Sequence, residues 1–165
     1  MSRKRSAPAK LSHVSEDGSA RMVDVSGKPS TERTARARGT IRMSKAAFEA
    51  IRLQRIAKGD VLSVARIAGI MAAKKTSDLV PLCHPLTLDD VDVTLTLDAE
   101  LPGLRAESRV VTVGRTGVEM EAIVAVSVAL VTVYDMAKSA DRGMIIDDIS
   151  LIEKTGGLSG AYYNR

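Results

Sequence analysis

The long apolar run over residues 117–138 constrains the fold more than any other stretch of this sequence. Ala, Val, Leu and Ile fill nearly every interior position, and no Gly or Pro interrupts them. A helix that is apolar all round is buried, so the run predicts a central, buried helix. Two short buried strands are the alternative, because Val lowers helix propensity. Thr116 and Glu119 have the spacing of a capping box, and residues 141–143 supply a stop.

Hydrophobic periodicity and turn residues divide the rest of the chain. Apolar and polar side chains alternate in several stretches, which predicts strands, and Ser44 and Asp60 are suitable N-caps for helices. The alternation changes parity at Asp89–Asp90, which predicts a bulge or a break, and Pro102–Gly103 predicts the turn of an antiparallel hairpin. The predicted elements are a strand (34–43), two helices (44–59 and 60–75), a proline-containing loop (77–85), two strands (91–97 and 104–113), the long helix and a last strand (144–154).

This order of elements is the split βαβ arrangement with one additional helix. It predicts the α+β class, with a ferredoxin-like antiparallel sheet. We expect one domain over residues 21–160, preceded by a flexible basic tail over residues 1–20 and followed by a short tail over residues 161–165.

Composition narrows the choice of partners and compartment. The chain has 165 residues and a formal net charge of +4, and Arg3, Lys4, Arg5 and Lys10 account for the whole excess. A Lys/Arg-rich tail is usually a solvated segment, so this charge does not require a nucleic-acid partner. Cys83 is the only cysteine, which excludes an intrachain disulfide and favours a reducing compartment.

The apolar run also bears on membranes. Its uninterrupted part, residues 122–133, is too short to cross a bilayer, and no signal-peptide hydrophobic region follows the basic start. These observations predict a cytoplasmic protein that does not bind membranes.

Five motifs occur in one order along most of the chain. They are Met-Val-Asp-Val (22–25), the segment from Lys58 to Lys74, Pro-Leu-Cys-His-Pro (81–85), Gly-Val-Glu-Met-Glu (117–121) and Tyr-Asp-Met-Ala-Lys (134–138). In these motifs, and over about residues 11–160, the chain resembles the MoaC family of molybdenum cofactor biosynthesis.

The resemblance implies a lyase. Its substrate would be a GTP derivative with a new bond between ribose and base (3′,8-cyclised), which is rearranged to cyclic pyranopterin monophosphate with release of pyrophosphate. It also implies a ferredoxin-like catalytic domain with added helices, and a homo-hexamer built as a trimer of dimers. No cofactor, metal or nucleic acid is expected.

The resemblance further implies which residues act. The catalytic set would be Asp135, Lys138, Lys58, Lys74 and His84. The substrate contacts would be Leu82, Cys83, His84, Glu119, Met120, Glu121, Arg33 and Lys154. Leu158 stands where the family often has a Lys, which counts against a phosphate role for the loop after Gly156–Gly157.

These residue types suit the implied chemistry. Lysines near helix ends ordinarily complement the helix dipole. Several lysines held together bind a triphosphate and depress one another's pKa towards about 7 to 8, where a lysine acts as acid or base. Asp135 and Lys138 share a helix face, so Asp135 is our first candidate for proton transfer, with Lys138 as its partner.

Other polar residues admit more than one interpretation. A lone histidine such as His84 is more often structural, and Cys83, His13 and His84 make a poor zinc set. The arginines at positions 36, 38 and 42 form one face of a predicted strand, which is either solvated or in reach of phosphates.

The spacing within the long helix predicts sites shared between subunits. On one straight helix Glu121 and Asp135 lie about 21 Å apart, at about 1.5 Å per residue. One compact site cannot use both ends of the same helix. If both segments touch one substrate, they come from two subunits that meet about a two-fold axis.

Two other function classes compete with the enzyme. Ferredoxin-like sheets can bind RNA through aromatic residues, but Phe48, Tyr134, Tyr162 and Tyr163 all lie outside the predicted strands. The remaining alternative is a regulatory domain that binds the GTP derivative without changing it.

Overall fold

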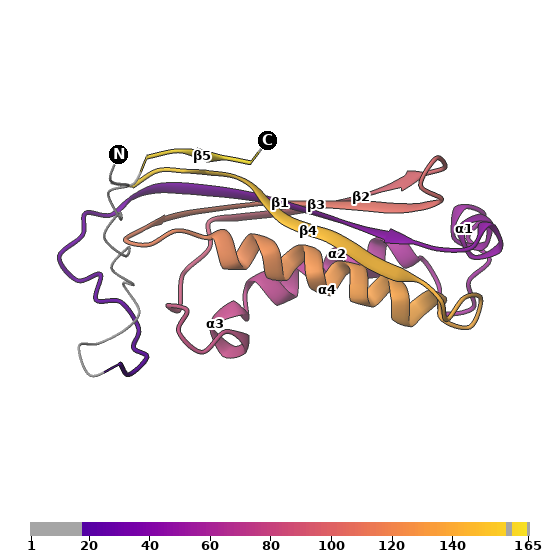
Figure 1. Cartoon of the computed structure of the whole chain (residues 1–165), viewed down its shortest axis with the longest axis horizontal. Coiled ribbons are helices and arrows are strands. Elements are labelled where there is room, and N and C mark those ends of the chain that lie inside the picture. The colour runs from indigo at the N-terminus through magenta and orange to yellow at the C-terminus, as the bar shows by residue number, and fades with distance from the viewer. Residues whose placement is uncertain (1–17, 158–159, 165) are drawn as a thin grey trace, which may run out of the picture.

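One antiparallel sheet with helices on one face forms the computed structural model, which describes residues 18–157 and 160–164 (Figure 1). Its strand order is β2-β3-β1-β4-β5. The strands are β1 (Thr31–Arg42), β2 (Asp90–Asp98), β3 (Gly103–Gly114), β4 (Ile145–Thr155) and β5 (Tyr162–Tyr163). The helices are α1 (Lys45–Arg52), α2 (Val61–Ala73), α3 (Thr76–Leu79) and α4 (Glu119–Ala137). The predicted α+β, ferredoxin-like fold class is confirmed.

The long apolar run forms helix α4, as predicted, and the alternative of two strands is wrong. The predicted capping box is also wrong. The N-cap is Val118, which makes no side-chain cap hydrogen bond. Glu119 cannot cap the helix because its carboxylate pairs with the Lys154 ammonium at 2.7 Å.

Only one face of α4 is buried in the single chain. Its buried side chains include Ala122, Ala125, Val126, Ala129, Leu130 and Val133. Val131, on the opposite face, is 55% exposed. The expectation of a helix buried all round therefore holds for the inner face only, and the outer face is apolar and open.

Helix α4 is longer than the apolar run of residues 122–133, which alone is too short to cross a membrane. With 19 residues it is long and apolar enough to cross a bilayer, and no other helix of the described residues passes that test. Half of its most apolar window is buried inside the fold, and the core helix of a protein passes the same test.

The shorter elements differ from prediction in three places. Helix α1 starts after Ser44, whose side chain accepts the expected cap hydrogen bond from the Ala47 N–H. It ends at Arg52 rather than near Gly59, because Gln54 adopts a φ of +53°, a conformation that ends a helix. Part of the loop predicted over residues 77–85 forms helix α3, which ends before Pro81. Strand β5 was not predicted. It places Tyr162 and Tyr163 in a strand, contrary to the expectation for aromatic residues.

The hairpin of β2 and β3 forms as predicted. Strand β2 begins at Asp90, and the break before it has a visible cause. The Asp89 carboxylate accepts a hydrogen bond from the Val113 backbone N–H at 2.7 Å, so a side chain replaces the next backbone partner. Most of the predicted basic tail (residues 1–17) and Leu158 lie outside the described residues, and the domain limits stay a prediction.

Helices α2 and α4 pack antiparallel across a very close contact. A Cβ atom at Gly69 of α2 would lie 2.8 Å from the Ala125 backbone oxygen and 3.3 Å from the Ala129 Cβ. Asp60, the N-cap of α2, starts that helix beside the end of α4, where Lys58 contacts Asp135. This contact therefore fixes which helix ends lie together.

We predict that Gly69→Ala lowers stability. Ala is worth about 1 kcal/mol more than Gly in a helix interior, but overpacking costs about 1 to 3 kcal/mol, so the clash wins. The expected result is a lower Tm in thermal denaturation. Gly27→Ala is the matched control, since a Cβ there meets nothing within 4 Å, and it should leave Tm nearly unchanged. A higher Tm for Gly69→Ala would show that helix propensity dominates and that the contact is loose.

Candidate active site

The predicted site residues form two groups at opposite ends of α4. Lys58, Asp135 and Lys138 lie together at its carboxyl end. The remaining candidates gather near its amino end. They are Leu82, Cys83, His84, Glu119, Met120, Glu121, Arg33 and Lys154.

Lys74 does not join the other two lysines within one chain. It is the C-cap of α2, so it lies a whole helix length from Lys58, about 20 Å at 1.5 Å per residue. Because α2 and α4 are antiparallel, Lys74 lies at the amino end of α4. The predicted cluster of three lysines therefore requires more than one chain.

Asp135 is held between two ammonium groups. Its Oδ1 accepts a hydrogen bond from Lys138 Nζ at 2.8 Å, and its Oδ2 accepts one from Lys58 Nζ at 2.6 Å. Lys58 also donates to the Asp135 backbone oxygen at 2.9 Å. The hydrogen bonds from Lys138 and Lys58 lower the pKa of Asp135 to about 2.

This geometry favours a positioning role for Asp135 over the proton transfer expected from the sequence. A carboxylate with a pKa of about 2 is a weak base at neutral pH, because a low pKa means a low affinity for a proton. It is well suited to fixing the positions of Lys58 and Lys138. Of its three N–H groups, the Lys58 ammonium keeps one and the Lys138 ammonium two for a phosphate or for delivering a proton.

The other end of α4 borders a hollow of about 540 Å³. Leu82, Cys83 and His84, in the loop after α3, line one part of it, and Met120 of α4 lines another. His84 Nε2 lies 2.8 Å from the Val23 backbone oxygen. A carbonyl oxygen only accepts, so Nε2 carries the hydrogen and the Nδ1 of a neutral His84 is an acceptor.

Glu121 is buried behind the cysteine. It is only 3% exposed, and its Oε1 accepts a hydrogen bond from Cys83 Sγ at 3.6 Å. Its Oε2 has no partner among the described residues. Burial raises the pKa of Glu121. Burial also raises the pKa of the Cys83 thiol, to about 11, and the neighbouring Glu121 carboxylate adds to that rise. Cys83 is therefore a protonated thiol at neutral pH rather than a nucleophile.

A smaller polar hollow of about 180 Å³ adjoins the first. Arg33 and Lys154, both predicted, line it, and so does Lys28. Lys28 was missed by sequence reasoning, although it lies three residues after the Met-Val-Asp-Val motif. Lys28 and Glu119 line both hollows, so the two are parts of one depression.

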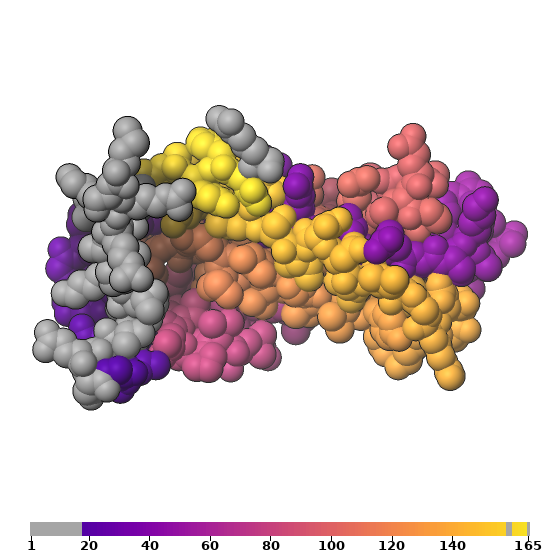
Figure 2. Space-filling view, viewed as in Figure 1, coloured from indigo at the N-terminus to yellow at the C-terminus, as the bar shows by residue number. Residues whose placement is uncertain are grey.

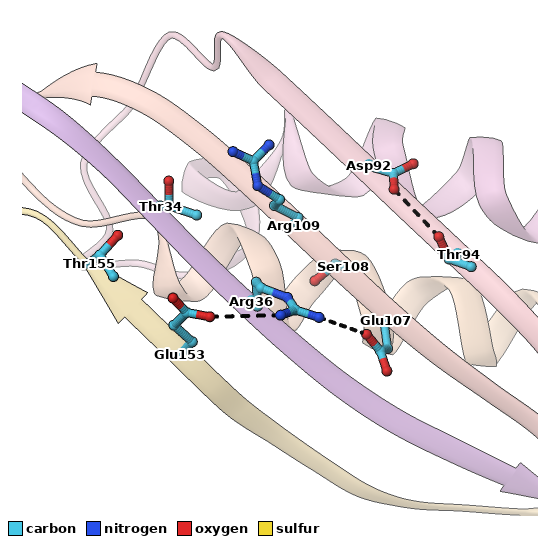
Figure 3. A pocket seen from close by; sticks show the side chains of 9 residues that line it. All are labelled: Thr34, Arg36, Asp92, Thr94, Glu107, Ser108, Arg109, Glu153 and Thr155. Carbon is cyan, nitrogen blue, oxygen red and sulfur yellow. Dashed lines mark hydrogen bonds and ion pairs between the residues drawn. The ribbon is translucent and has the colours of Figure 1, made fainter. Parts of the chain in front are cut away.

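The arginine face of β1 lies elsewhere. The lining residues of a hollow of about 520 Å³ lie on the open face of the sheet. Among them, Arg36 lies between Glu107 and Glu153 (Figure 3). Arg42 pairs with Asp147. Strand alternation places Arg33 on the helical side of β1 and Arg36 on the open side. The paired arginines are thus a solvated face, away from the candidate site.

Metal ligands are not grouped in the part of the chain that the structure describes. No set of three His, Cys, Asp or Glu side chains there is placed to hold a metal ion.

The fold and the two groups of residues define a class. This is a ferredoxin-like protein with lysines, an arginine and a partly apolar hollow at its surface, a combination suited to binding an anionic small molecule. The model of the MoaC family matches residues 22–157. The chain belongs to the MoaC family.

Several curated relatives match nearly the whole chain. A cyclic pyranopterin monophosphate synthase of Heliobacterium modesticaldum is 59% identical over 92% of this chain and 96% of its own. Proteins of the same name from Thermomicrobium roseum and Novosphingobium aromaticivorans are 56% and 58% identical, over 93% and 92% of this chain and 93% and 96% of theirs.

We predict that the Asp135 carboxyl titrates at about 2. Lys138→Met should raise this midpoint towards the ordinary 3.8, measured by carbon-13 NMR of the carboxyl carbon. The folded pKa lies below the unfolded one, so Asp135 stabilises the fold above pH 3.8, and this contribution is lost as the pH falls through about 2. Asp135→Asn should therefore lower Tm at pH 7 but not at pH 2.

Arg109→Met is the matched control for this titration, because Arg109 pairs with Asp90 on the open face of the sheet, on the opposite side from α4. It should leave the Asp135 midpoint unchanged. A midpoint near 4 in the unaltered protein would mean that the two lysines do not hold the carboxylate in solution.

Proposed function

We propose that this protein is a lyase of molybdenum cofactor biosynthesis, which converts a 3′,8-cyclised GTP derivative to cyclic pyranopterin monophosphate and releases pyrophosphate. Its relatives carry the name of this synthase over nearly their full length. The structural observation that supports the chemistry is the clamp of Asp135 between Lys58 and Lys138.

The charged residues of the site have two kinds of role in this reaction. Lys58, Lys138 and Lys74 neutralise the phosphates and deliver or remove protons, and Asp135 fixes the first two. The larger hollow takes the ring system of the substrate, where Leu82 and Met120 contact it and His84 supplies a hydrogen-bond acceptor. The cyclic phosphate forms when a hydroxyl oxygen of the substrate attacks the α-phosphorus, its proton passes to a base, and the bond to the leaving pyrophosphate breaks.

The complete site lies between two chains. Within one chain the clamp and the hollow are a helix length apart, so a partner must bring the missing half. We propose a homo-hexamer, arranged as a trimer of dimers, with the sites at the dimer interface. A cytoplasmic location accompanies this proposal.

The outer face of α4 supports such a dimer. At 100° per residue, Met120, Val124, Ser127 and Val131 lie on one stripe that ends at Asp135, opposite the buried face. Met120 is 37% and Val131 55% exposed. The Ser127 hydroxyl is satisfied by the Ile123 backbone oxygen at 2.8 Å, so the middle of the stripe is small and uncharged. Figure 2 shows α4, in orange, open at the surface beside β4.

This stripe is self-complementary about its middle. If two copies pack antiparallel with the two-fold axis near Ser127, Met120 of each copy faces Asp135 of the other, and Val124 faces Val131. The clamp of one chain then meets the hollow of its partner. Two equivalent sites result from one interface.

Pyrophosphate release tests the function. Purified protein, given the cyclised nucleotide freshly made by the upstream enzyme, should release pyrophosphate. Lys58→Ala and Asp135→Asn should each lower kcat by about 100-fold, the usual scale for losing a positioned proton carrier or its orienting group. Arg109→Ala, on the open face of the sheet away from the candidate site, should retain activity. Recovery of unchanged nucleotide after tight binding would instead identify a regulatory domain without catalysis.

Cross-linking tests the dimer. Ser127→Cys lies at the proposed two-fold axis, so mild oxidation should join two chains, since a disulfide needs Cα atoms within about 7 Å. Val113→Cys, on the open face of the sheet and 62% exposed, is the matched control and should not cross-link. Mixing Asp135→Asn with Glu121→Ala protein should restore activity. A covalent dimer from Val113→Cys alone would place the interface on the sheet instead.

A further inference from the structure

The middle of the open face of the sheet holds one arginine without a partner. Strand alternation directs several arginines of β1 and β3 to this face, because the residues between them are buried. All but Arg38 pair with carboxylates of the described chain, and the pairs are Arg36–Glu107, Arg36–Glu153, Arg42–Asp147, Arg105–Asp98 and Arg109–Asp90. Glu107 lies directly opposite Arg38 in the register of β1 and β3, but Arg36 binds it at 3.1 Å (Figure 3). The Arg38 guanidinium is therefore left free.

The free arginine lines a hollow that also contains a free carboxylate. This hollow has a volume of about 520 Å³, and its lining residues are Arg38, Thr40, Arg105, Asp148, Ile149 and Ser150. Within residues 18–157 and 160–164, neither the Asp148 carboxylate nor the Ser150 hydroxyl makes a hydrogen bond or an ion pair. A cation and an anion thus line one hollow without pairing with each other, and both are available to a ligand.

The backbone beside Arg38 is irregular in a way that places the carboxylate. Strand β4 departs from regular pairing with β1 on both sides of Ser150, which lies opposite Arg38. In one of these two irregularities Asp148 adopts a φ of +56°, a left-handed conformation that favours glycine. Bulges redirect side chains and are frequent beside binding sites, and strained residues are held where they serve a function. Glycine would relieve the strain, so the carboxylate is the feature that distinguishes Asp148 from an ordinary bulge residue.

The two opposite charges restrict the kind of ligand. An inorganic anion would be attracted by Arg38 and repelled by Asp148, and a metal cation would meet the reverse combination. A zwitterion satisfies both groups. The hollow therefore favours a small molecule that carries an anionic and a cationic group side by side.

A free α-amino acid has this combination of groups. Its carboxylate matches the planar guanidinium of Arg38, which can donate two parallel N–H hydrogen bonds. Its ammonium group matches the Asp148 carboxylate, which only accepts, and the Ser150 hydroxyl can donate to the ligand carboxylate. A hollow of about 520 Å³ leaves room for an amino-acid side chain as well.

We propose that the open face of the sheet carries a second binding site, in which Arg38 and Asp148 bind the carboxylate and the ammonium group of a free α-amino acid. The site lies on the opposite side of the sheet from α4. It shares no residue with the candidate active site, and it does not depend on the proposed reaction.

Isothermal titration of the whole protein with the common L-amino acids, one at a time, tests this site. At least one of them should bind. Its N-acetyl derivative, which lacks the ammonium group, and its amide, which lacks the carboxylate, should each bind with a Kd at least about tenfold higher. Arg38→Met and Asp148→Asn should each weaken binding of the free amino acid to a similar extent. Arg109→Met is the matched control, since Arg109 lies on the same face but pairs with Asp90, and it should leave the Kd unchanged.

Asp148→Gly separates binding from folding. Glycine adopts the left-handed conformation without steric cost, so this variant should bind the amino acid more weakly while its Tm stays the same or rises. The second site is wrong if no amino acid binds, or if Arg38→Met and Asp148→Gly bind it as tightly as the unaltered protein does. Equal binding of the N-acetyl derivative would reduce the site to a simple anion site and would contradict the role of Asp148.

Discussion

The fold depends on how closely α4 can approach its neighbours. Glycines make that approach possible on two sides. A Cβ at Gly39 of β1 would lie 2.9 Å from side-chain atoms of Leu130 and Val126, and Gly69 of α2 lies directly against the α4 backbone. With few aromatic residues in the chain, small side chains and short distances supply the dispersion contacts that large rings give in other cores.

The same packing determines where function can lie. The sheet side and the α2 side of α4 are closed, so only its two ends and its outer stripe remain available. Both groups of candidate residues lie at those ends, and the loops that carry them, before α2 and after α3, are placed by the antiparallel helix pair. The candidate site thus follows from the helix contact rather than from the charged sheet face shown in Figure 3.

Much of the fold was predictable because its signals are local. The alternation in β1 and β2, the N-caps Ser44 and Asp60, and the unbroken apolar run each depend on neighbouring residues only. The failures depend on contacts across the fold. Thr116 and Glu119 have the spacing of a capping box, but Lys154 of a distant strand captures the carboxylate.

The candidate site shows the same division. The motifs identified most of the candidate residues. Only the fold shows that Lys74 lies far from Lys58, that two lysines lower the pKa of Asp135, and that Lys28 lies beside the site. Lys28 lies in a loop without periodicity, so no sequence pattern marks it. The Met-Val-Asp-Val segment, just before Lys28, is held beside His84 by the hydrogen bond to the Val23 carbonyl. This contact brings Lys28 to the site.

The position of the functional groups at both ends of α4 fixes the length and phase of that helix. Adding or deleting one residue inside it would turn Asp135 by about 100° relative to Glu121 and move it about 1.5 Å along the axis. The aspartate would then leave the outer stripe and lose the reach of Lys58. If the candidate residues at its two ends act in one site, α4 has to keep the same number of residues.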